Sequence, residues 1–284
     1  MPGSIADVTD VAPPSDRPVI LRSGDATVTL FPSLGGRIGQ IDVDGQPLLV
    51  DVPDLDSGDA HPMQWGSFAM APWAGRIRRG RFAFDGRDHR LPINHRDGPG
   101  SDRAHAIHGL VFDRPVDSGS VDGSDAARSW SGTTALEWEF GGSVSQTVTV
   151  SDDRVVSSLR IDATAGRFPA EIGWHPWFRK PDRLEFEPSS MYERDEFGLP
   201  TGRLVAPSDG PWDDCFITTE PIVLRYDRPT ASAVTVTSDC DHVVVYDQPD
   251  DTTCVEPQSG PPDAFNLHPH IVAPELTRTM TISW

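Results

Sequence analysis

Short segments in which apolar and polar residues alternate dominate this chain, and turns rich in glycine and aspartate separate them. The clearest run spans residues 135–163. Three segments, separated by two short turns, make up this run: 135–140, 144–150 and 155–163. Alternation with a period of two is typical of a β-strand that buries one face. The run is therefore predicted to be an antiparallel meander of three strands.

The rest of the chain repeats this pattern. Asp44-Gly45 and Asp85-Gly86 are dipeptides typical of two-residue hairpin turns, and each lies between strand-like segments. Further strands are predicted at 27–31, 41–43, 47–50, 81–84, 88–93, 222–226, 233–237, 243–246 and 280–284. Helical periodicity is absent apart from short turns expected near 54–58 or 263–266. The 25 glycines and 27 prolines also argue against a helical bundle, so the sequence predicts a β-sandwich or β-barrel.

The domain organisation follows from the length and the distribution of turn residues. A chain of 284 residues can form one large β domain or two small ones. No long linker occurs after the N-terminal segment, which is rich in Pro, Asp and Ser. We therefore expect a flexible arm over residues 1–17 and a single catalytic β-sandwich domain over residues 18–284.

The net charge of −19 excludes several classes of partner. Such a charge repels the phosphates of nucleic acids and the anionic surface of membranes. No apolar run approaches the roughly 20 residues of a membrane span. We expect a small-molecule partner, with no nucleic acid and no membrane.

The cysteines and the first residues bear on the compartment. Cys215, Cys240 and Cys254 are odd in number, widely spaced and without a CxxC motif, which favours free thiols in a reducing compartment. The N-terminal segment has neither the basic region nor the apolar region of a secretory signal. A cytoplasmic protein is predicted.

An aromatic-rich stretch around His175 is the first candidate for a functional site. It reads EIGWHPWF over residues 171–178. The following proline favours an extended backbone at His175, and Trp174, Trp177 and Phe178 lie beside it in the sequence. Aromatic faces next to a polar side chain suit a sugar, whose C–H face stacks while its hydroxyls need polar partners. The alternative is a core aromatic cluster around a hydrogen-bonded histidine.

Glu256 is the second candidate. It lies between Val255 and Pro257 in the stretch CVEPQSGPPDAFN, residues 254–266. An apolar setting desolvates a carboxyl group, which raises its pKa and makes it a stronger base near neutral pH. The alternative is a glutamate at a strand end that faces water.

Three further segments carry polar side chains. His105 and His108 are close in sequence, but a histidine pair outside a helix with no evident third ligand is weak evidence for a metal, so none is expected. Asp213 and Asp214 occur in an apolar segment, where an aspartate either binds substrate hydroxyls or caps a turn. The arginines at positions 76, 78, 79 and 81 form either a solvated strand face or a clamp for hydroxyls or phosphate.

Taken in this order, these segments resemble the aldose 1-epimerase (galactose mutarotase) family. The matching stretches are PWAGRIRRGRF (72–82), AIHGLV (106–111), EIGWHPWF (171–178), WDDCF (212–216) and CVEPQSGPPDAFN (254–266). The resemblance implies an all-β fold, namely a large antiparallel β-sandwich of the galactose mutarotase-like supersandwich type. It also implies an isomerase that works without a cofactor.

The resemblance also implies roles for particular residues. The catalytic residues fall on Glu256 and His175, and the residues that bind substrate fall on Arg76, His108 and Asp213. Because Asp214 is adjacent, it could replace Asp213 in this role. Two aromatic residues, Trp73 and Trp177, are expected to cover the sugar ring. The family often has asparagine at the position of Gly75, so one hydroxyl contact is expected to be absent or supplied elsewhere.

The function implied is interconversion of the α and β anomers of free aldohexoses such as glucose or galactose by acid–base ring opening and closure. One alternative is a hexose-6-phosphate 1-epimerase of the same superfamily, although the segments APWAGR and HGLVF depart from that branch. A second alternative is a non-catalytic carbohydrate-binding protein on the same scaffold, and a third is a cupin-like metal enzyme. A monomer or a homodimer is expected.

Overall fold

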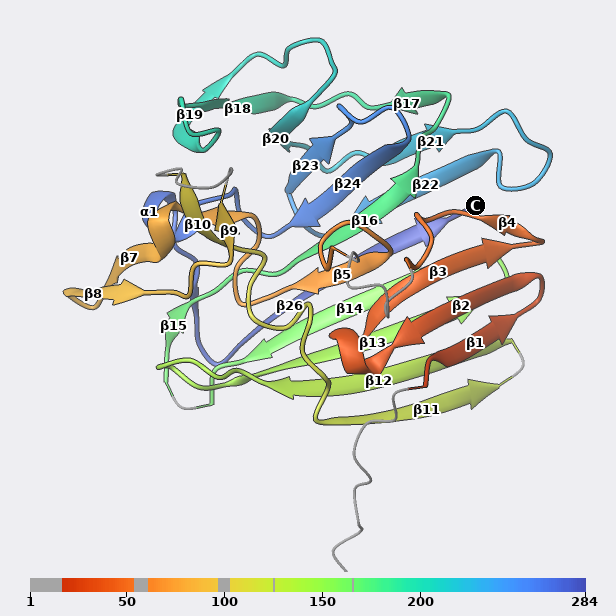
Figure 1. Ribbon diagram of the computed structural model, residues 1–284, viewed down its shortest axis with the longest axis horizontal. Helices are drawn as coiled ribbons and strands as arrows, with labels where there is room; N and C mark the ends of the chain where they lie inside the picture. The colour runs from red at the N-terminus through yellow and green to blue at the C-terminus, as the bar shows by residue number, and fades with distance from the viewer. Residues whose placement is uncertain (1–16, 54–60, 97–102, 125, 165) are drawn as a thin grey trace, which may run out of the picture.

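The computed structural model describes residues 17–53, 61–96, 103–124, 126–164 and 166–284. Within these ranges two large sheets lie face to face, and every strand pair in them is antiparallel (Figure 1). This arrangement confirms the predicted antiparallel β-sandwich. The predicted arm, apart from Arg17, and the helical turn expected near 54–58 lie outside the described residues.

Among the described residues the larger sheet has eleven strands, and it forms part of the site described below. Its strands, in spatial order, are β1 (Val19–Ser23), β2 (Ala26–Phe31), β3 (Arg37–Val43), β5 (Ser67–Met70), β16 (Gly173–Arg179), β24 (Thr252–Gln258), β23 (His242–Tyr246), β20 (Asp213–Ile217), β18 (Ser190–Arg194) and β19 (Pro200–Val205), with β4 (Gln46–Pro47) paired to β3.

The second sheet has eight strands and covers one face of the first. Its strands, in spatial order, are β11 (Ser118–Ser124), β12 (Ala127–Ala135), β13 (Ser143–Ser151), β14 (Arg154–Asp162), β26 (Glu275–Ser283), β22 (Ala233–Ser238), β21 (Ile222–Arg225) and β17 (Arg183–Glu185).

Smaller elements accompany the two large sheets. They are the three-stranded sheet of β6 (Arg76–Ile77), β10 (Ala104–Ile107) and β9 (His95–Arg96), the hairpin of β7 (Arg81–Phe84) and β8 (Arg87–Arg90), the pair β15 (Phe168–Pro169) and β25 (Ile271–Val272), the 3₁₀ turns η1 (Pro32–Leu34) and η2 (Arg78–Gly80), and the one-turn helix α1 (Ala264–Leu267). Of these, β7 to β10 and α1 lie together at one end of the molecule (Figure 1). The helical turn expected near 263–266 is thus present as α1.

Alternation along the strands separates the core from the site. On β16 the side chains of Trp174 and Phe178 belong to the main hydrophobic core between the two sheets. The intervening residues His175 and Trp177 point to the opposite face. The same division holds on β24, where Val255 lies in the core and Glu256 does not.

Both predicted two-residue hairpins are present. At Asp44-Gly45 the φ angles are 51° and 76°, and at Asp85-Gly86 they are 47° and 73°. Positive φ at both central residues is the requirement of a type I′ turn, which aspartate and glycine meet more readily than other residues.

The first strand of the predicted meander, at residues 135–140, is wrong, whereas the second and third strands are present as β13 and β14. Residues 136–142 form the connection between β12 and β13, because Leu136 N–H donates to the Gly142 carbonyl and Gly141 N–H donates to the Trp138 carbonyl. Their apolar–polar alternation reflects side chains that pack onto an aromatic cluster from a loop. The true first strand, β12, was missed because Gly132 and Thr134 occupy its inward positions beside Trp130.

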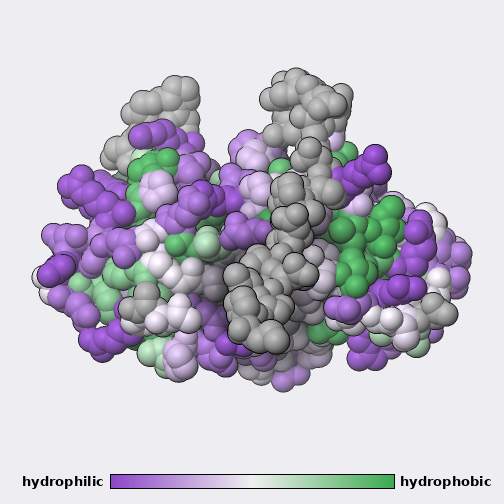
Figure 2. Space-filling model, turned by 90° about the horizontal axis from the view of Figure 1, so that it is seen from below, coloured by the Kyte–Doolittle hydropathy of each residue, from purple (hydrophilic) through white to green (hydrophobic). Residues whose placement is uncertain are grey.

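Other strand boundaries shift by smaller amounts. β8 ends at Arg90 rather than at residue 93, and β4 ends at Pro47 rather than at residue 50. None of the helices in the described ranges has the length and apolar character needed to cross a bilayer. From below, the surface is mainly hydrophilic, with hydrophobic side chains in separate clusters (Figure 2).

Candidate active site

The outer face of the large sheet brings the two predicted catalytic residues together. On one side of His175 the register pairs it with Phe68 of β5. On the other side β16 and β24 pair Trp177 with Cys254 and Gly173 with Gln258, so Glu256 lies beside His175. His175 and Glu256 are distant in sequence, and only this strand pairing makes them neighbours.

A cavity of about 280 Å³ lies over this part of the sheet and is called the inner cavity below. Its lining residues are His61, Met63, Gln64, Gly75, Arg76, His95, Ile107, His108, His175, Trp177, Asp213, Val244, Tyr246, Gln248, Glu256 and Pro262. Six of the seven residues predicted for the site therefore line one cavity: Glu256, His175, Arg76, His108, Asp213 and Trp177.

The centre of the inner cavity is the pair formed by His175 and Glu256. Nε2 of the imidazole lies 3.3 Å from Oε1 of the carboxyl group, a close polar contact. The two residues are only 6% and 4% exposed. Both residues line the inner cavity, so a molecule bound there is within reach of an acid and a base.

The imidazole of His175 is held between two aromatic rings. Phe68 stacks on it at a centroid distance of 4.8 Å, and Trp177 stacks on it at 5.2 Å. Burial is the main cause that lowers the pKa of His175 to about 3, and the nearby positive charges of Arg37 and Arg76 contribute to this shift. The stacking fixes the plane of the ring. Because the ring is buried, the imidazole is neutral when no ligand is bound.

Glu256 is affected in the opposite direction. Burial raises its pKa well above the usual value for a glutamate, and the carboxylate of Asp213 adds to this shift. Arg76 acts against it, because its positive charge favours the ionised carboxylate. In the absence of a ligand, the pair therefore holds one proton over a wide pH range.

His108 approaches the pair from a neighbouring loop. Its ring meets that of His175 edge to face at 4.9 Å. Burial lowers the pKa of His108 well below its usual value, so it is a neutral hydrogen-bonding group at neutral pH. Its backbone has φ of 60°, which costs of order 1 kcal/mol or more for a residue other than glycine. The adjacent Gly109 continues this left-handed conformation with φ of 81°.

The loop that carries Arg76 is fixed by two buried carboxyl groups. Glu171 Oε2 accepts a hydrogen bond from Ala74 N–H at 3.4 Å, and Asp263 Oδ1 accepts one from Arg78 N–H at 2.9 Å. Asp263 N–H also donates to the Arg76 carbonyl at 2.7 Å. The aspartate of the PPDAFN stretch thus holds the arginine loop in place and does not itself line the inner cavity.

Of the arginines in this segment, only Arg76 lines the inner cavity. Arg78 is bound to Asp195 and Asp263, and the side chains of Arg79 and Arg81 are exposed. A clamp of four arginines is therefore not formed.

The structure also distinguishes the two adjacent aspartates. Asp213 lines the inner cavity, whereas Asp214, the next residue on β20, does not. Arg194 contacts both, at 3.0 Å from Asp213 Oδ2 and 2.9 Å from Asp214 Oδ1.

The two tryptophans expected over a sugar ring are placed differently. Trp177 forms part of the cavity wall, and its buried Nε1–H has no hydrogen-bond partner among the described residues. Trp73 is fully buried in a separate hydrophobic cluster with Ile77, Phe82 and Phe265 and does not line the inner cavity. The prediction that Trp73 contacts substrate is therefore not retained.

Some lining residues were missed from the sequence. Tyr246 lies on β23, where its register partner Cys254 shows that it shares the outer face with Glu256. His95 enters from β9, which pairs with β10 just before His108. The position of Tyr246 follows from strand register, and that of His95 follows from the pairing of two very short strands. Neither position is marked by a local pattern in the sequence.

The same face holds one group of potential metal ligands in the described part of the chain. Ligand atoms of His175, Cys254 and Glu256 lie within 4.8 Å of one another. All three residues are buried, and burial raises the pKa of the Cys254 thiol well above its usual value, which disfavours the thiolate that a metal needs. We assign no ion to this group.

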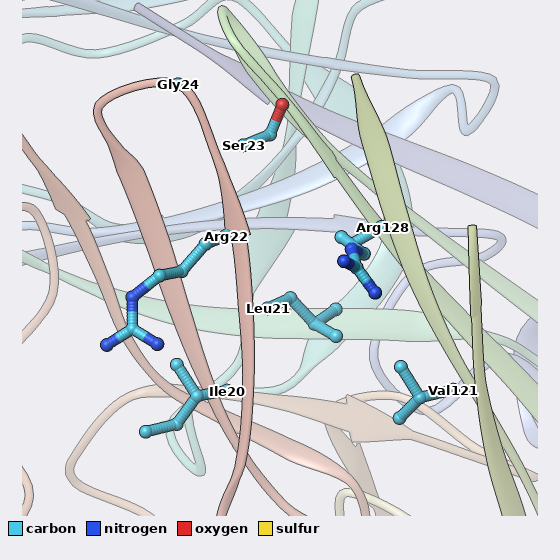
Figure 3. Close-up of a pocket in the computed structure, with 7 residues that line it drawn as sticks. All are labelled: Ile20, Leu21, Arg22, Ser23, Gly24, Val121 and Arg128. Carbon is cyan, nitrogen blue, oxygen red and sulfur yellow. The ribbon is translucent and has the colours of Figure 1, made fainter. Parts of the chain in front are cut away.

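A different cavity lies at an edge of the sandwich, between β1 and the strands β11 and β12 (Figure 3). It measures about 390 Å³ and is lined by residues such as Leu21, Val121 and Arg128. None of the described residues that line it carries a carboxyl or imidazole group, so these residues offer no acid–base pair.

The fold and the inner cavity define a galactose mutarotase-like β-sandwich. The sequence model of the aldose 1-epimerase family matches residues 18–283, and the chain belongs to this family. No curated protein sequence matches the chain.

Solved structures share the fold at low sequence identity. A galactose mutarotase-like protein from Clostridium acetobutylicum is 15% identical, with a TM-score of 0.76 over 93% of this chain and 94% of that one. Galactose 1-epimerase from Lactobacillus acidophilus is 15% identical, with a TM-score of 0.73 over 94% and 93%. A protein from Escherichia coli K12 is 20% identical, with a TM-score of 0.74 over 94% and 98%.

Proposed function

We propose that this protein is an aldose 1-epimerase that interconverts the anomers of free aldohexoses without a cofactor. The observation that carries the proposal is the buried pair of His175 Nε2 and Glu256 Oε1, 3.3 Å apart in the inner cavity. Membership of the aldose 1-epimerase family supports the reaction type.

The geometry of the pair matches the chemistry of a hemiacetal. The hydroxyl oxygen O1 and the ring oxygen O5 are bonded to the same carbon, C1, so two adjacent protein groups can reach both. Glu256 takes the proton from O1, while His175, as the imidazolium, delivers a proton to O5. The C1–O5 bond breaks as the C1=O1 aldehyde forms, rotation about C1–C2 exposes the other face, and the two proton transfers reverse on closure.

Substrate binding and proton transfer are coupled through the single proton of the pair. The reaction needs the carboxylate of Glu256 together with protonated His175, and this form has the same number of protons as the neutral acid with the neutral imidazole. A polar sugar in the cavity favours the charged form, because its hydroxyls solvate the charges that burial disfavours. Acid–base assistance of this kind is worth roughly 10²–10⁴-fold in rate.

The remaining polar groups of the inner cavity are assigned to the sugar hydroxyls. Arg76 and Asp213 supply donors and an acceptor, and neutral His108 supplies either, according to its tautomer. Trp177 covers the ring and offers its Nε1–H. A phosphorylated sugar is less favoured, because Arg78 is occupied by Asp195 and Asp263 while Asp213 brings a negative charge to the wall.

We also propose that the protein works in the cytoplasm. Cys215, Cys240 and Cys254 are all free and buried thiols, which suits a reducing compartment.

The test is polarimetry of freshly dissolved α-glucose and α-galactose with purified protein. Accelerated approach to the equilibrium rotation is expected for at least one of them. Glu256→Gln is expected to lower the rate at least about a hundredfold, since glutamine cannot take up the O1 proton. His175→Asn is expected to have a comparable effect, and circular dichroism checks that both variants fold. A wild-type rate in either variant would remove that residue from its assigned role.

A further inference from the structure

Lys180 is the only lysine of the chain, and it follows directly on β16. Its side chain reaches the loop of residues 247–251, which joins β23 to β24 next to β16 (Figure 1). The ammonium group donates hydrogen bonds to the backbone carbonyls of Asp247 and, at 3.0 Å, of Pro249. Lys180 N–H also donates to the Asp251 carbonyl at 2.9 Å. This one residue therefore binds the loop at three points.

The middle of the loop depends on these contacts. Among the described residues, no hydrogen bond involves residues 248–250 apart from the one between Lys180 and the Pro249 carbonyl. Three of the five loop residues are aspartates, but no carboxylate oxygen in the described part of the chain lies within 4.0 Å of the ammonium. The charge of Lys180 therefore acts on the backbone of the loop, through charge-assisted hydrogen bonds that are stronger than neutral ones.

This loop is connected to two polar groups of the inner cavity. Gln248 lines the cavity and lies between the two carbonyls that Lys180 binds. Asp247 N–H donates to the Trp212 carbonyl at 3.0 Å, and Asp247 Oδ1 accepts a hydrogen bond from Trp212 N–H at 2.7 Å. Trp212 directly precedes Asp213, which also lines the cavity. Lys180 is therefore linked to both cavity residues through the backbone of the loop.

Of these two cavity residues, Gln248 is the one whose position depends on Lys180. Asp213 is also bound by Arg194 and by the pairing of β20 with β23. Gln248 is exposed, and no described residue forms a hydrogen bond with it. Its amide offers both donors and an acceptor, which suits the hydroxyls of a sugar. A side chain on a fixed backbone loses less entropy when it binds a ligand.

We propose that Lys180 is a positioning residue for substrate binding, because its ammonium holds the loop of residues 247–251 so that the Gln248 amide contacts a sugar in the inner cavity. Lys180 does not itself line the cavity, so it acts through Gln248. This inference rests on the proposed function for the nature of the ligand. His175 and Glu256 are held by strand pairing and ring stacking, so the effect of Lys180 is expected in KM more than in kcat.

The experiment measures kcat and KM by polarimetry, with whichever of glucose and galactose the wild-type protein converts faster. Lys180→Met removes the ammonium and should raise KM about tenfold, the worth of one hydrogen bond, with kcat within about threefold. Gln248→Ala should raise KM to a similar extent. In the double variant KM should exceed that of Gln248→Ala by less than about twofold, since the two residues act as one unit.

Two further variants separate positioning from general effects of charge and folding. Lys180→Arg keeps a charged donor and should hold KM within about threefold of wild type. Arg154→Met is the matched control, because it removes one positive charge from an exposed side chain outside the inner cavity, and it should leave KM unchanged. Circular dichroism checks that every variant folds.

A wild-type KM in Gln248→Ala would overturn the proposal, whether or not Lys180→Met folds. So would fully additive effects in the double variant, or an equal rise of KM in Lys180→Arg and Lys180→Met. If no sugar is anomerised at all, the proposed function fails, and calorimetric binding of glucose then decides the role of Lys180 separately. Weaker binding in Lys180→Met and in Gln248→Ala, without additivity, would support it. Unchanged binding, or no binding of glucose to the wild-type protein, would refute it.

Discussion

At the scale of single residues, packing determines both the orientation and the pKa of His175. Its ring is stacked between Phe68 and Trp177, and the ring of His108 meets it edge to face. The same packing that orients the imidazole also desolvates it and lowers its pKa to about 3. Glu256 responds to the same burial with a raised pKa, so between these two pKa values the two residues together hold one proton.

The shared proton predicts an unusual pH profile. A second proton adds to the pair only near the lowered pKa of His175, about 3, and the first leaves only at the raised pKa of Glu256. Between these limits the proton count of the pair is constant. We therefore expect kcat/KM for glucose to change by less than about twofold between pH 5 and pH 7, without the inflection near 6.5 of a free imidazole.

The measurement is polarimetry in a series of buffers, with the buffer-catalysed rate subtracted at each pH. Circular dichroism at each pH checks that the protein is folded. A tenfold loss per pH unit on acidification below 6.5 would mean that His175 titrates as an independent base and that the two residues do not share a proton.

At the scale of elements, the site depends on strand register and on one isolated parallel bridge. Gly109 forms this bridge with Ala71, close in sequence to Arg76, and the bridge positions the neighbouring residue His108. A Cβ atom at Gly109 would lie 2.0 Å from the Ala71 carbonyl oxygen, and φ at this residue is 81°. The glycine of the His-Gly dipeptide is therefore required by sterics as well as by backbone conformation.

Gly109→Ala is predicted to destabilise the fold and to impair substrate binding. We expect a loss of about 3 kcal/mol, because the left-handed backbone alone costs about 1–2 kcal/mol for alanine and the contact with Ala71 adds to it. Gly86→Ala is the matched control, since Gly86 has φ of 73° but open space around a Cβ atom. Urea denaturation of both variants measures the difference, and polarimetry should show a raised KM for Gly109→Ala only.

Equal destabilisation of the two glycine variants would contradict the steric argument. It would show that backbone strain accounts for the whole effect at Gly109 and that the chain can shift away from Ala71 at little cost.

How much of these elements could be predicted depends on where their signal is located. β13 and β14 follow from regular alternation within the strand, and both hairpin turns follow from Asp-Gly pairs. β12 was missed because its inward positions include glycine and threonine, which carry little apolar signal. The cross-strand register that brings Tyr246 beside Glu256 is a property of pairing over long sequence distances.

The same limit applies to the candidate site. Single-residue chemistry indicated His175 and Glu256, and the alternation on β20 separates Asp213 from Asp214, which the sequence alone left open. Trp73 was expected to cover the sugar ring because it is an aromatic residue in one of the matching stretches. Its burial against Phe265 and Phe82 depends on how β6, β7 and α1 pack together, which no local pattern records.

At the scale of the whole molecule, the net charge of −19 acts on stability and leaves a neutral substrate unaffected. Excess like charge destabilises the compact state through self-repulsion, and salt screens it over a Debye length that falls from about 30 Å at 0.01 M to about 3 Å at 1 M. Salt also weakens the surface ion pairs, but such pairs contribute only about 0–1 kcal/mol each. The general repulsion is therefore expected to dominate.

We expect the melting temperature to rise between 0.01 M and 0.5 M NaCl, while kcat/KM for glucose stays within about twofold because a neutral sugar does not respond to the screened field. Calorimetry and polarimetry on the same samples measure the two effects, and chloride salts avoid the added stabilisation that sulfate brings through surface exclusion. As a control, the rise should diminish near the pH at which the net charge approaches zero.

A phosphorylated sugar would behave differently, since an anion approaching this surface gains from screening. A rise in kcat/KM for glucose 6-phosphate with salt, to a value above that for glucose, would contradict the free-aldose assignment, because it would mean that the inner cavity favours an anion against the field of the whole protein.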